Sequence, residues 1–457
     1  METSKRLTLI AAILGSSIVF IDGTVVNVAL VPIQADLGGG LAAQQWVVDA
    51  YLLTLGSLIL VGGSLGDIFG EVRVFRLGVA SFGLASVLCA LAPTSTSLIV
   101  FRGLQGIAGA LLTPASLAIL TATFSGDERG AAIGTWTAWS GISTVVGPLF
   151  GGWLIGVSSW RLIFLLNVPI AIATLAITGV MALHESRREG ARVDVVGGAL
   201  CVVGLGALVF GFIEQPSRGW DAAVVGALVG GLLALVAFVV WEMHEPQPML
   251  PLELFRLRNF SVTNIETFAV YGGFGAWIFF LVLYLQQIAG YSPFLAGLAT
   301  LPVTVVMFFV SRVAGRYSMR YGPRWFMAGG PLIAGLSVTA FARAPADPSY
   351  WLDLFPPLLG FSLGLSLTVA PLTTTVLSDA GPSDAGIASG VNNAIARIAG
   401  LVSIAVIGIG ASSGTGHLTM HGFHLSMMVT GVLIVVGGLI GAIGIRNPQH
   451  VAVTAPA

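Results

Sequence analysis

The feature that most constrains this chain is a succession of fourteen long apolar stretches. A helix that crosses a bilayer needs about 20 mostly apolar residues, because each residue adds about 1.5 Å to its length. We therefore predict an all-α polytopic membrane protein with fourteen spans. The stretches cover residues 7–31, 44–65, 73–92, 97–120, 130–155, 160–183, 195–214, 221–241, 260–286, 293–314, 322–342, 350–377, 386–411 and 424–446.

Composition excludes several other classes of protein. Charged residues make up 9% of the 457 residues, whereas soluble proteins carry about 25%. The formal net charge of −1 provides no basic surface for nucleic acid. The two cysteines, Cys89 and Cys201, lie in apolar stretches and indicate neither a disulfide framework nor a metal site. No Gly-x-x-x-x-Gly-Lys-Ser/Thr motif is present, so we expect no bound nucleotide and no cofactor.

The basic residues predict the orientation in the membrane. If the N-terminus is cytoplasmic and the spans alternate, fifteen of the 20 Lys and Arg residues fall on the cytoplasmic side and three fall outside. Positive charge accumulates on the cytoplasmic side of membrane proteins. We therefore expect a multi-pass protein of the cell membrane with both termini in the cytoplasm.

The chain divides into three blocks. We expect a six-helix bundle over 1–183, a linker with helices 7 and 8 over 184–259, and a second six-helix bundle with a short cytoplasmic tail over 260–457. Short charged turns that contain glycine follow the second helix of each bundle, at 66–73 and 315–324. Two related six-helix halves are typical of secondary transporters, which bind substrate near the midplane between the halves.

Several motifs resemble those of the major facilitator superfamily. Residues 63–70 are similar to its helix 2–3 loop signature, 101–109 to its helix 4 signature, and 141–152 to the helix 5 signature of its antiporters. Residues 22–30 resemble the helix 1 signature of the 14-helix drug:proton antiporters, the QacA/EmrB type, and 160–169 and 284–293 are also similar to that type. The resemblance extends over nearly the whole chain.

This resemblance implies a major facilitator fold, with two six-helix bundles and two extra helices between them. It also implies a monomeric, proton-coupled multidrug efflux antiporter that exports hydrophobic and in some cases cationic compounds by alternating access. The proton gradient would supply the energy, and the protein would not be an enzyme. Two alternatives remain: a dedicated exporter of one metabolite or self-made antibiotic, and a polytopic membrane enzyme.

Three ionisable residues of the first half are predicted to share one layer of the membrane, namely Asp22, Asp49 and Arg102. Intramembrane charges cost about 2.5–3.5 kcal/mol to insert, so each invites a functional interpretation. A carboxyl group near an arginine is subject to opposing effects of charge and desolvation, which suits a group that loads and releases a proton. The alternative is a static ion pair between Asp22 and Arg102.

Glu266 is the acid predicted to lie well inside the second half. It is interpreted as a counter-ion for cationic substrates, as a second proton site, or as a buried carboxyl paired with Arg397. Arg397, Asn392 and Asn393 are assigned with Glu266 to the substrate or second proton site. For these three residues, polar contacts between helices are the favoured interpretation.

Two motifs are predicted to act in conformational change. Asp67, with Gly70 and Arg73 nearby, is expected to gate the cytoplasmic side by resting against the N-terminus of the helix over 386–411. The second motif is expected to bend helix 5 and to form a tight seam between the halves, although a simple packing kink stays open. Its residues are Gly147, Pro148, Gly151 and Gly152.

Overall fold

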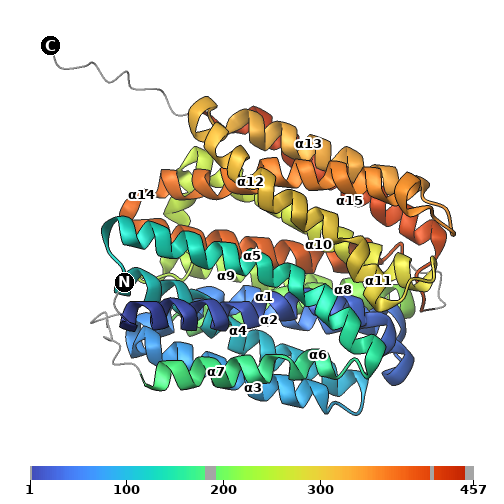
Figure 1. Cartoon of the computed structure of the whole chain (residues 1–457), viewed down its shortest axis with the longest axis horizontal. Helices are drawn as coiled ribbons and strands as arrows, with labels where there is room; N and C mark the ends of the chain where they lie inside the picture. The colour runs from blue at the N-terminus through green and yellow to red at the C-terminus, as the bar shows by residue number, and fades with distance from the viewer. Residues whose placement is uncertain (1–2, 181–191, 412–415, 448–457) are drawn as a thin grey trace.

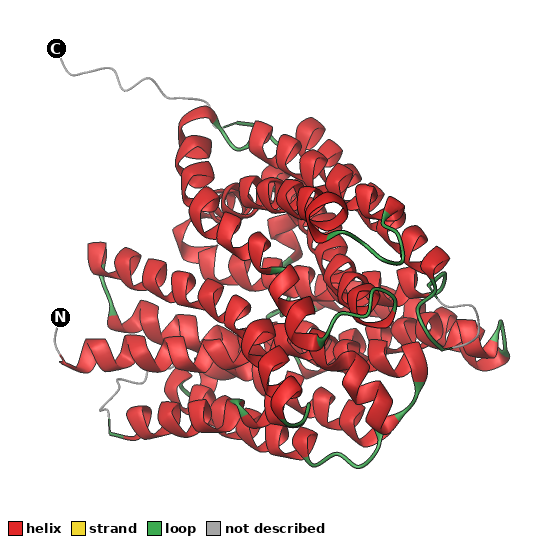
Figure 2. Ribbon diagram, turned by 45° about the vertical axis from the view of Figure 1, so that its right-hand side comes forward, coloured by secondary structure: helices red, strands yellow, loops and turns green. Residues whose placement is uncertain are grey.

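The computed structural model describes residues 3–180, 192–411 and 416–447. Its regular elements are helices (Figure 2), and fourteen segments are long and apolar enough to cross a membrane, which confirms the predicted number. The predicted end of the sixth span at 183, residues 184–191 of the linker and the tail after 447 lie outside the described residues.

The first six spans form one side of the molecule (Figure 1). Gly70 joins the second and third helices with a φ of 96°, a backbone conformation that glycine adopts at little cost. The sixth span consists of two helical pieces. The elements are α1 (Thr3–Leu37), α2 (Gly40–Phe69), α3 (Glu71–Ala90), α4 (Ser95–Thr123), α5 (Gly126–Val157), α6 (Leu162–Leu165) and α7 (Asn167–Gly179).

The two extra helices form a hairpin of α8 (Val195–Arg218) and α9 (Ala222–His244). Helix α8 packs on α2 and α14, and α9 covers α8. The outer face of α9 consists mainly of exposed apolar side chains such as Leu232, Leu233 and Val236. The hairpin therefore stands beside both halves, with α9 suited to contact with lipid.

The last six spans form the other side of the molecule (Figure 1). A short 3₁₀ turn, η1 (Leu252–Arg256), leads into them. The elements are α10 (Arg258–Gln287), α11 (Pro293–Ala299), α12 (Leu301–Tyr321), α13 (Arg324–Ala340), η2 (Phe341–Arg343), η3 (Tyr350–Leu354), α14 (Phe355–Gly408) and α15 (Met420–Gly444).

Helix α14 corrects one prediction. The polar stretch with Gly381 and Pro382 predicts a break between spans over 350–377 and 386–411, yet the backbone is helical from Phe355 through Gly408. Its 54 residues would measure about 81 Å if straight, so η3 and α14 together supply two spans, Tyr350–Ser378 and Ala385–Gly408. No helix begins at 386, and the helix N-terminus predicted to receive Asp67 is not formed.

The two halves meet where α1 packs on α10 and α11, α5 on α11 and α12, and α2 on α14. The largest hydrophobic core draws side chains from both halves, among them Leu30 of α1 and Trp277 and Phe280 of α10. The boundary between the halves is therefore a packed, mainly apolar interface that contains single polar side chains.

Candidate functional site

A buried polar cluster forms around Asp22 in the first half. The Asp22 Oδ2 atom accepts a hydrogen bond from Arg102 Nη1 of α4, and both side chains are at most 1% exposed. The Asp22 Oδ1 atom accepts from Gln105 Nε2 at 2.9 Å and from Asn167 Nδ2 at 3.0 Å. Three helices, α1, α4 and α7, thus converge on one carboxylate. The structure brings Asp22 and Arg102 together.

Arg102 is held from several directions at once. Its Nε atom donates to the carbonyl of Val47 on α2 at 3.0 Å, and its guanidinium lies 4.3 Å from the centre of the Tyr51 ring. Gln105 also donates to Ser86 Oγ of α3 at 2.9 Å. A buried charge pair is stable only when its remaining hydrogen-bonding groups are satisfied, and groups from five helices of the bundle surround this pair.

Asp49 is buried apart from this cluster. Both of its carboxylate oxygens are fully buried and lack a hydrogen-bond partner among the described residues. It shares the face of α2 that meets α14, because Gln45 donates to the carbonyl of Ile404 at 2.8 Å and Gly56 lies against Arg397. The structure therefore places Asp49 between the two halves, with no counter-charge among the described residues.

A cavity of about 60 Å³ lies between the two halves. Thr24 and Asn27 of α1 line one side, and Phe274 and Trp277 of α10 line the other. The Trp277 ring stacks on Phe361 at 4.2 Å, and its buried indole N–H has no acceptor among the described residues. Binding sites for drug-sized ligands usually measure about 300–1,000 Å³, so this cavity is smaller than such a site.

Helix α1 connects the polar cluster to the cavity. Asp22 points to α4 and α7, whereas Thr24, Asn27 and Val28 face the cavity. Successive residues of a helix are separated by about 100°, which places these two sets on opposite faces of α1. A change at Asp22 can therefore move the wall of the cavity by shifting one helix.

The motif in α5 forms the predicted close contacts. A β-carbon on Gly147 would lie 2.5 Å from Thr24 Oγ1, and one on Gly151 would overlap Val25. Gly152 faces the other half, where a β-carbon would lie 2.7 Å from the Phe294 Cα atom of α11. The Pro148 carbonyl rests against Gly297 of α11 in the same way. This stretch of α5 is therefore a tight seam with α1 on one side and α11 on the other.

Glu266 lies inside the second bundle, away from the cavity. Its Oε2 atom lies over Gly441 of α15, close to the carbonyl of Met327 on α13, and neither carboxylate oxygen has a hydrogen-bond partner among the described residues. Arg397 instead lies against Gly56 of α2. The interpretation of Glu266 and Arg397 as an ion pair is wrong, because their helices present these side chains to different neighbours. The proton-site interpretation stays a prediction.

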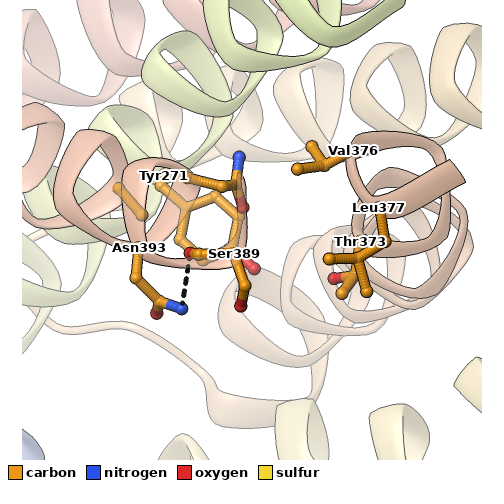
Figure 3. A pocket seen from close by; sticks show the side chains of 8 residues that line it. Tyr271, Thr373, Val376, Leu377, Ser389 and Asn393 are labelled. Carbon is orange, nitrogen blue, oxygen red and sulfur yellow. Dashed lines mark hydrogen bonds between the residues drawn. The ribbon is translucent and has the colours of Figure 1, made fainter. Parts of the chain in front are cut away.

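The two asparagines of α14 border a second cavity, of about 90 Å³ (Figure 3). Asn392 donates to Asn264 Oδ1 at 3.0 Å and to Thr267 Oγ1 at 2.8 Å, which joins α14 to α10. Asn393 is exposed and donates to the carbonyl of Ser389. These contacts fit the polar link between helices that the sequence predicts, while a substrate role stays a prediction.

The predicted gate lies at the turn between α2 and α3. Asp67 is exposed in the last turn of α2, Gly70 forms the turn, and Arg73 is exposed in the first turn of α3. Their role in gating stays a prediction, and α14 passes residue 386 as a continuous helix.

Sequence reasoning missed several polar residues that complete these sites. Gln105 follows Arg102 by one helical turn, a spacing that places both side chains on one face and could have indicated it. Asn167 belongs to a motif that was noted but not assigned a role. Gln286 and Gln287 of α10 bond across the boundary, to the Val28 carbonyl at 3.0 Å and to Gln44 Oε1 at 3.3 Å. No sequence signal identifies such pairs.

Comparison with known proteins agrees with this architecture. The family model described as Major Facilitator Superfamily matches residues 12–404. The tetracenomycin C resistance and export protein of Streptomyces glaucescens is 34% identical, over 90% of this chain and 76% of its own. The puromycin resistance protein pur8 of Streptomyces alboniger is 36% identical, over 93% and 86%. The multidrug resistance protein Stp of Mycobacterium tuberculosis is 34% identical, over 89% and 76%.

Solved structures support the fold. The D-xylose-proton symporter superposes with a TM-score of 0.70 at 14% identity, over 97% of this chain and 99% of its own. A peptide transporter superposes with a TM-score of 0.68 at 17% identity, over 96% and 94%. Fourteen apolar spans, two helical halves around an interface and a family match over most of the sequence agree, and the chain belongs to the major facilitator superfamily.

Proposed function

We propose that this protein exports hydrophobic organic compounds across the cell membrane in exchange for protons, with both termini in the cytoplasm. The names of its relatives support export, since they include an antibiotic export protein and a multidrug resistance protein. Each of these relatives is matched over most of this chain. The observation that carries the proton part of the proposal is the buried Asp22 cluster on the reverse face of the helix that lines the cavity.

In this proposal the proton and the transported compound act on the same helix, α1, from its two opposite faces. A proton on Asp22 would remove its charge and weaken the contact with Arg102, which frees α1 to shift against α4 and α7. Asp49, which has no counter-charge, is too costly to keep ionised in this state and holds a proton between α2 and α14. Asp22 and Asp49 would thus respond to the same proton gradient, Asp22 where α1 meets α4 and α7, and Asp49 where α2 meets α14.

The packing of α5 supports a state that is open toward the cytoplasm. The outer part of α5 is joined to α11 at Gly152, whereas β-carbons on Gly130, Gly134 and Gly141 would meet no atom within 4 Å. In the predicted orientation these three glycines belong to the cytoplasmic half of α5. Compounds would then enter from the cytoplasm or the inner leaflet and leave after the seam between α5 and α11 opens.

The lining of the cavity favours neutral aromatic compounds with a hydrogen-bond acceptor. None of the described lining residues is ionisable, and Glu266 lies elsewhere. The aromatic faces of Phe274 and Trp277 provide stacking, and the free indole N–H of Trp277 provides one donor. Export of a single metabolite is the second candidate, because several relatives are named for resistance to one antibiotic.

The test is transport into inverted proteoliposomes with an imposed pH gradient and a panel of neutral and cationic aromatic compounds. We expect gradient-dependent uptake of several neutral compounds by the wild type. Trp277→Phe keeps the ring and removes the donor, so it should weaken transport of compounds that carry an acceptor and spare those without one. Transport of a single compound would favour the dedicated exporter, and the absence of gradient-dependent transport would contradict both.

A further inference from the structure

Two carboxylates meet at the base of the α8–α9 hairpin, far along the chain from the Asp22 cluster. Asp194 caps the start of α8, where its Oδ1 atom accepts from the Gly197 amide at 2.8 Å and from Trp241 Nε1 at 2.9 Å. Glu242 ends α9, where its Oε2 atom accepts from the Leu250 amide at 2.8 Å. Each carboxylate thus uses one oxygen to hold the local structure.

The other oxygen of each carboxylate points to the same place. Asp194 Oδ2 lies 2.3 Å, and Glu242 Oε1 2.4 Å, from the point that a β-carbon on Gly197 would occupy. The two oxygens are therefore at most about 4.7 Å apart, the sum of 2.3 and 2.4 Å. Neither accepts a hydrogen bond from a donor among the described residues, and the residues are only 7% and 3% exposed.

Two ionised carboxylates cannot share such a buried place without a neutralising partner. Like charges at this separation repel strongly where water is excluded, so one carboxyl of such a pair binds a proton. A metal ion would need further ligands, and the described residues contain no group of three His, Cys, Asp or Glu side chains that could hold one. The donor set fits one proton held between the two free oxygens.

Among the described residues, the surroundings of the pair provide no basic group that would replace this proton. Helix α2, which packs on α8, presents Leu58 and Val61 next to Gly198. The ionisable neighbours along the chain are Arg192 before α8 and His244 and Glu245 at the end of α9. His244 is exposed and directs its Nδ1 atom to the Val240 carbonyl at 2.8 Å.

We propose that Asp194 and Glu242 form a single-proton site that fastens the α8–α9 hairpin to the linker before α10. Glu242 holds the Leu250 amide of that linker, and the shared proton holds Glu242 to Asp194. Loss of the proton places two negative charges together and separates the base of the hairpin from residue 250. The site is independent of the transported compound and does not rest on the proposed export function.

The test is the melting temperature of the full-length protein in detergent between about pH 6 and 9. The unfolded chain has already released this proton below about pH 6, whereas the folded pair still holds it. Stability therefore falls as pH rises through this range, until the folded pair also loses the proton. Glu242→Gln and Asp194→Asn each remove the shared proton, so each should flatten the fall in melting temperature. The double variant should flatten it no further, because one proton cannot be removed twice.

Asp221→Asn is the matched control at the other end of the same hairpin. Asp221 caps α9, and the Val224 amide and the Arg218 side chain hold the pKa of Asp221 below its ordinary value. It stays ionised over the whole range, and asparagine caps helices equally well, so the wild-type profile should be retained. Hydrogen exchange at the Leu250 amide, corrected for intrinsic rate, should increase with pH in the wild type and in this control alone.

Three outcomes would overturn the proposal. They are an unchanged pH profile in both single variants, additive effects in the double variant, and a loss of wild-type stability on treatment with a metal chelator, which would indicate a cation in place of the proton. If one single variant does not fold, the other carries the test, since both remove the same proton.

Discussion

At the scale of single residues, the Asp22–Arg102 pair decides how substitutions should be interpreted. Asn in place of Asp22 cannot accept a full charge-assisted bond from Arg102, and a buried arginine without its partner costs about 3–5 kcal/mol. We predict that Asp22→Asn abolishes proton-coupled transport and also lowers the melting temperature.

The double variant Asp22→Asn/Arg102→Gln separates coupling from stability. Removal of both charges should restore much of the melting temperature without restoring coupled transport. Transport and melting curves measured on the same preparations check this. A single variant that is stable and still pumps would remove Asp22 from the mechanism.

Substitution of Asp49 should affect the melting temperature in the opposite direction to substitution of Asp22. Because its carboxyl group has no hydrogen-bond partner among the described residues, Asp49→Asn loses no donor and relieves a buried acid. We predict an unchanged or higher melting temperature, together with a transport rate that depends less on pH. A large loss of stability would show that Asp49 has a partner that holds the fold together.

A substitution of Glu266 tests whether the second half of the protein distinguishes cationic from neutral substrates. Its position over Gly441, away from the cavity, predicts that Glu266→Gln changes the binding of cationic and neutral ligands of similar shape to the same extent. Equilibrium binding of matched ligand pairs measures this. Selective loss of cation binding would return Glu266 to the role of counter-ion.

The sequence identified the acids but only one of their partners, Arg102. Charges within apolar stretches are visible in any sequence, and their cost in a bilayer made Asp22, Asp49, Arg102 and Glu266 candidates. Their partners depend on helix rotation and crossing, which a broad apolar surface does not specify. That is why Asn167 was overlooked and why Glu266 was paired with Arg397.

At the scale of elements, the seam between α5 and α11 offers a controlled experiment. A methyl group on Gly152 would clash with backbone of α11, whereas Gly156, one turn further along the same helix, has no atom within 4 Å of such a group. We predict that Gly152→Ala separates the outer ends of the halves and slows transport, while Gly156→Ala leaves transport unchanged. Cross-linking between cysteines placed on α5 and α11 should fall in the first variant alone.

Equal transport by Gly152→Ala and Gly156→Ala would show that the seam is packing without a role in the transport cycle. The magnitude follows from the distance of only 2.7 Å between a β-carbon on residue 152 and Phe294 Cα. Overpacking of this kind costs typically about 1–3 kcal/mol, which is a loss of about 5- to 150-fold in the population of the closed seam.

Hydropathy predicted the number of spans and most of their positions, because burial in lipid demands length and apolar composition. It did not predict the connection within α14, since a polar stretch with glycine and proline is compatible with a loop or with a bent helix. The short breaks at Leu166 and Thr300 were missed for a related reason. They preserve the apolar pattern while the backbone changes direction.

At the scale of the whole molecule, α1 joins the two functions that an exchanger must link. One face holds the buried acid and the other lines the cavity between the halves. The two halves are held together at one end of their interface by Gln286, Gln287 and the glycines of α5. Sequence motifs implied two halves, but only the packing indicates which end is closed.

The measurement that tests this account most directly follows protons and substrate in the same proteoliposomes. A pH-sensitive dye inside the vesicles would report proton movement while a transported aromatic compound is added on one side in the absence of an imposed gradient. We predict that substrate movement drives protons in the opposite direction in the wild type, and that Asp22→Asn/Arg102→Gln moves no protons with substrate. Proton movement that persists in this double variant, or substrate movement without protons in the wild type, would contradict the account.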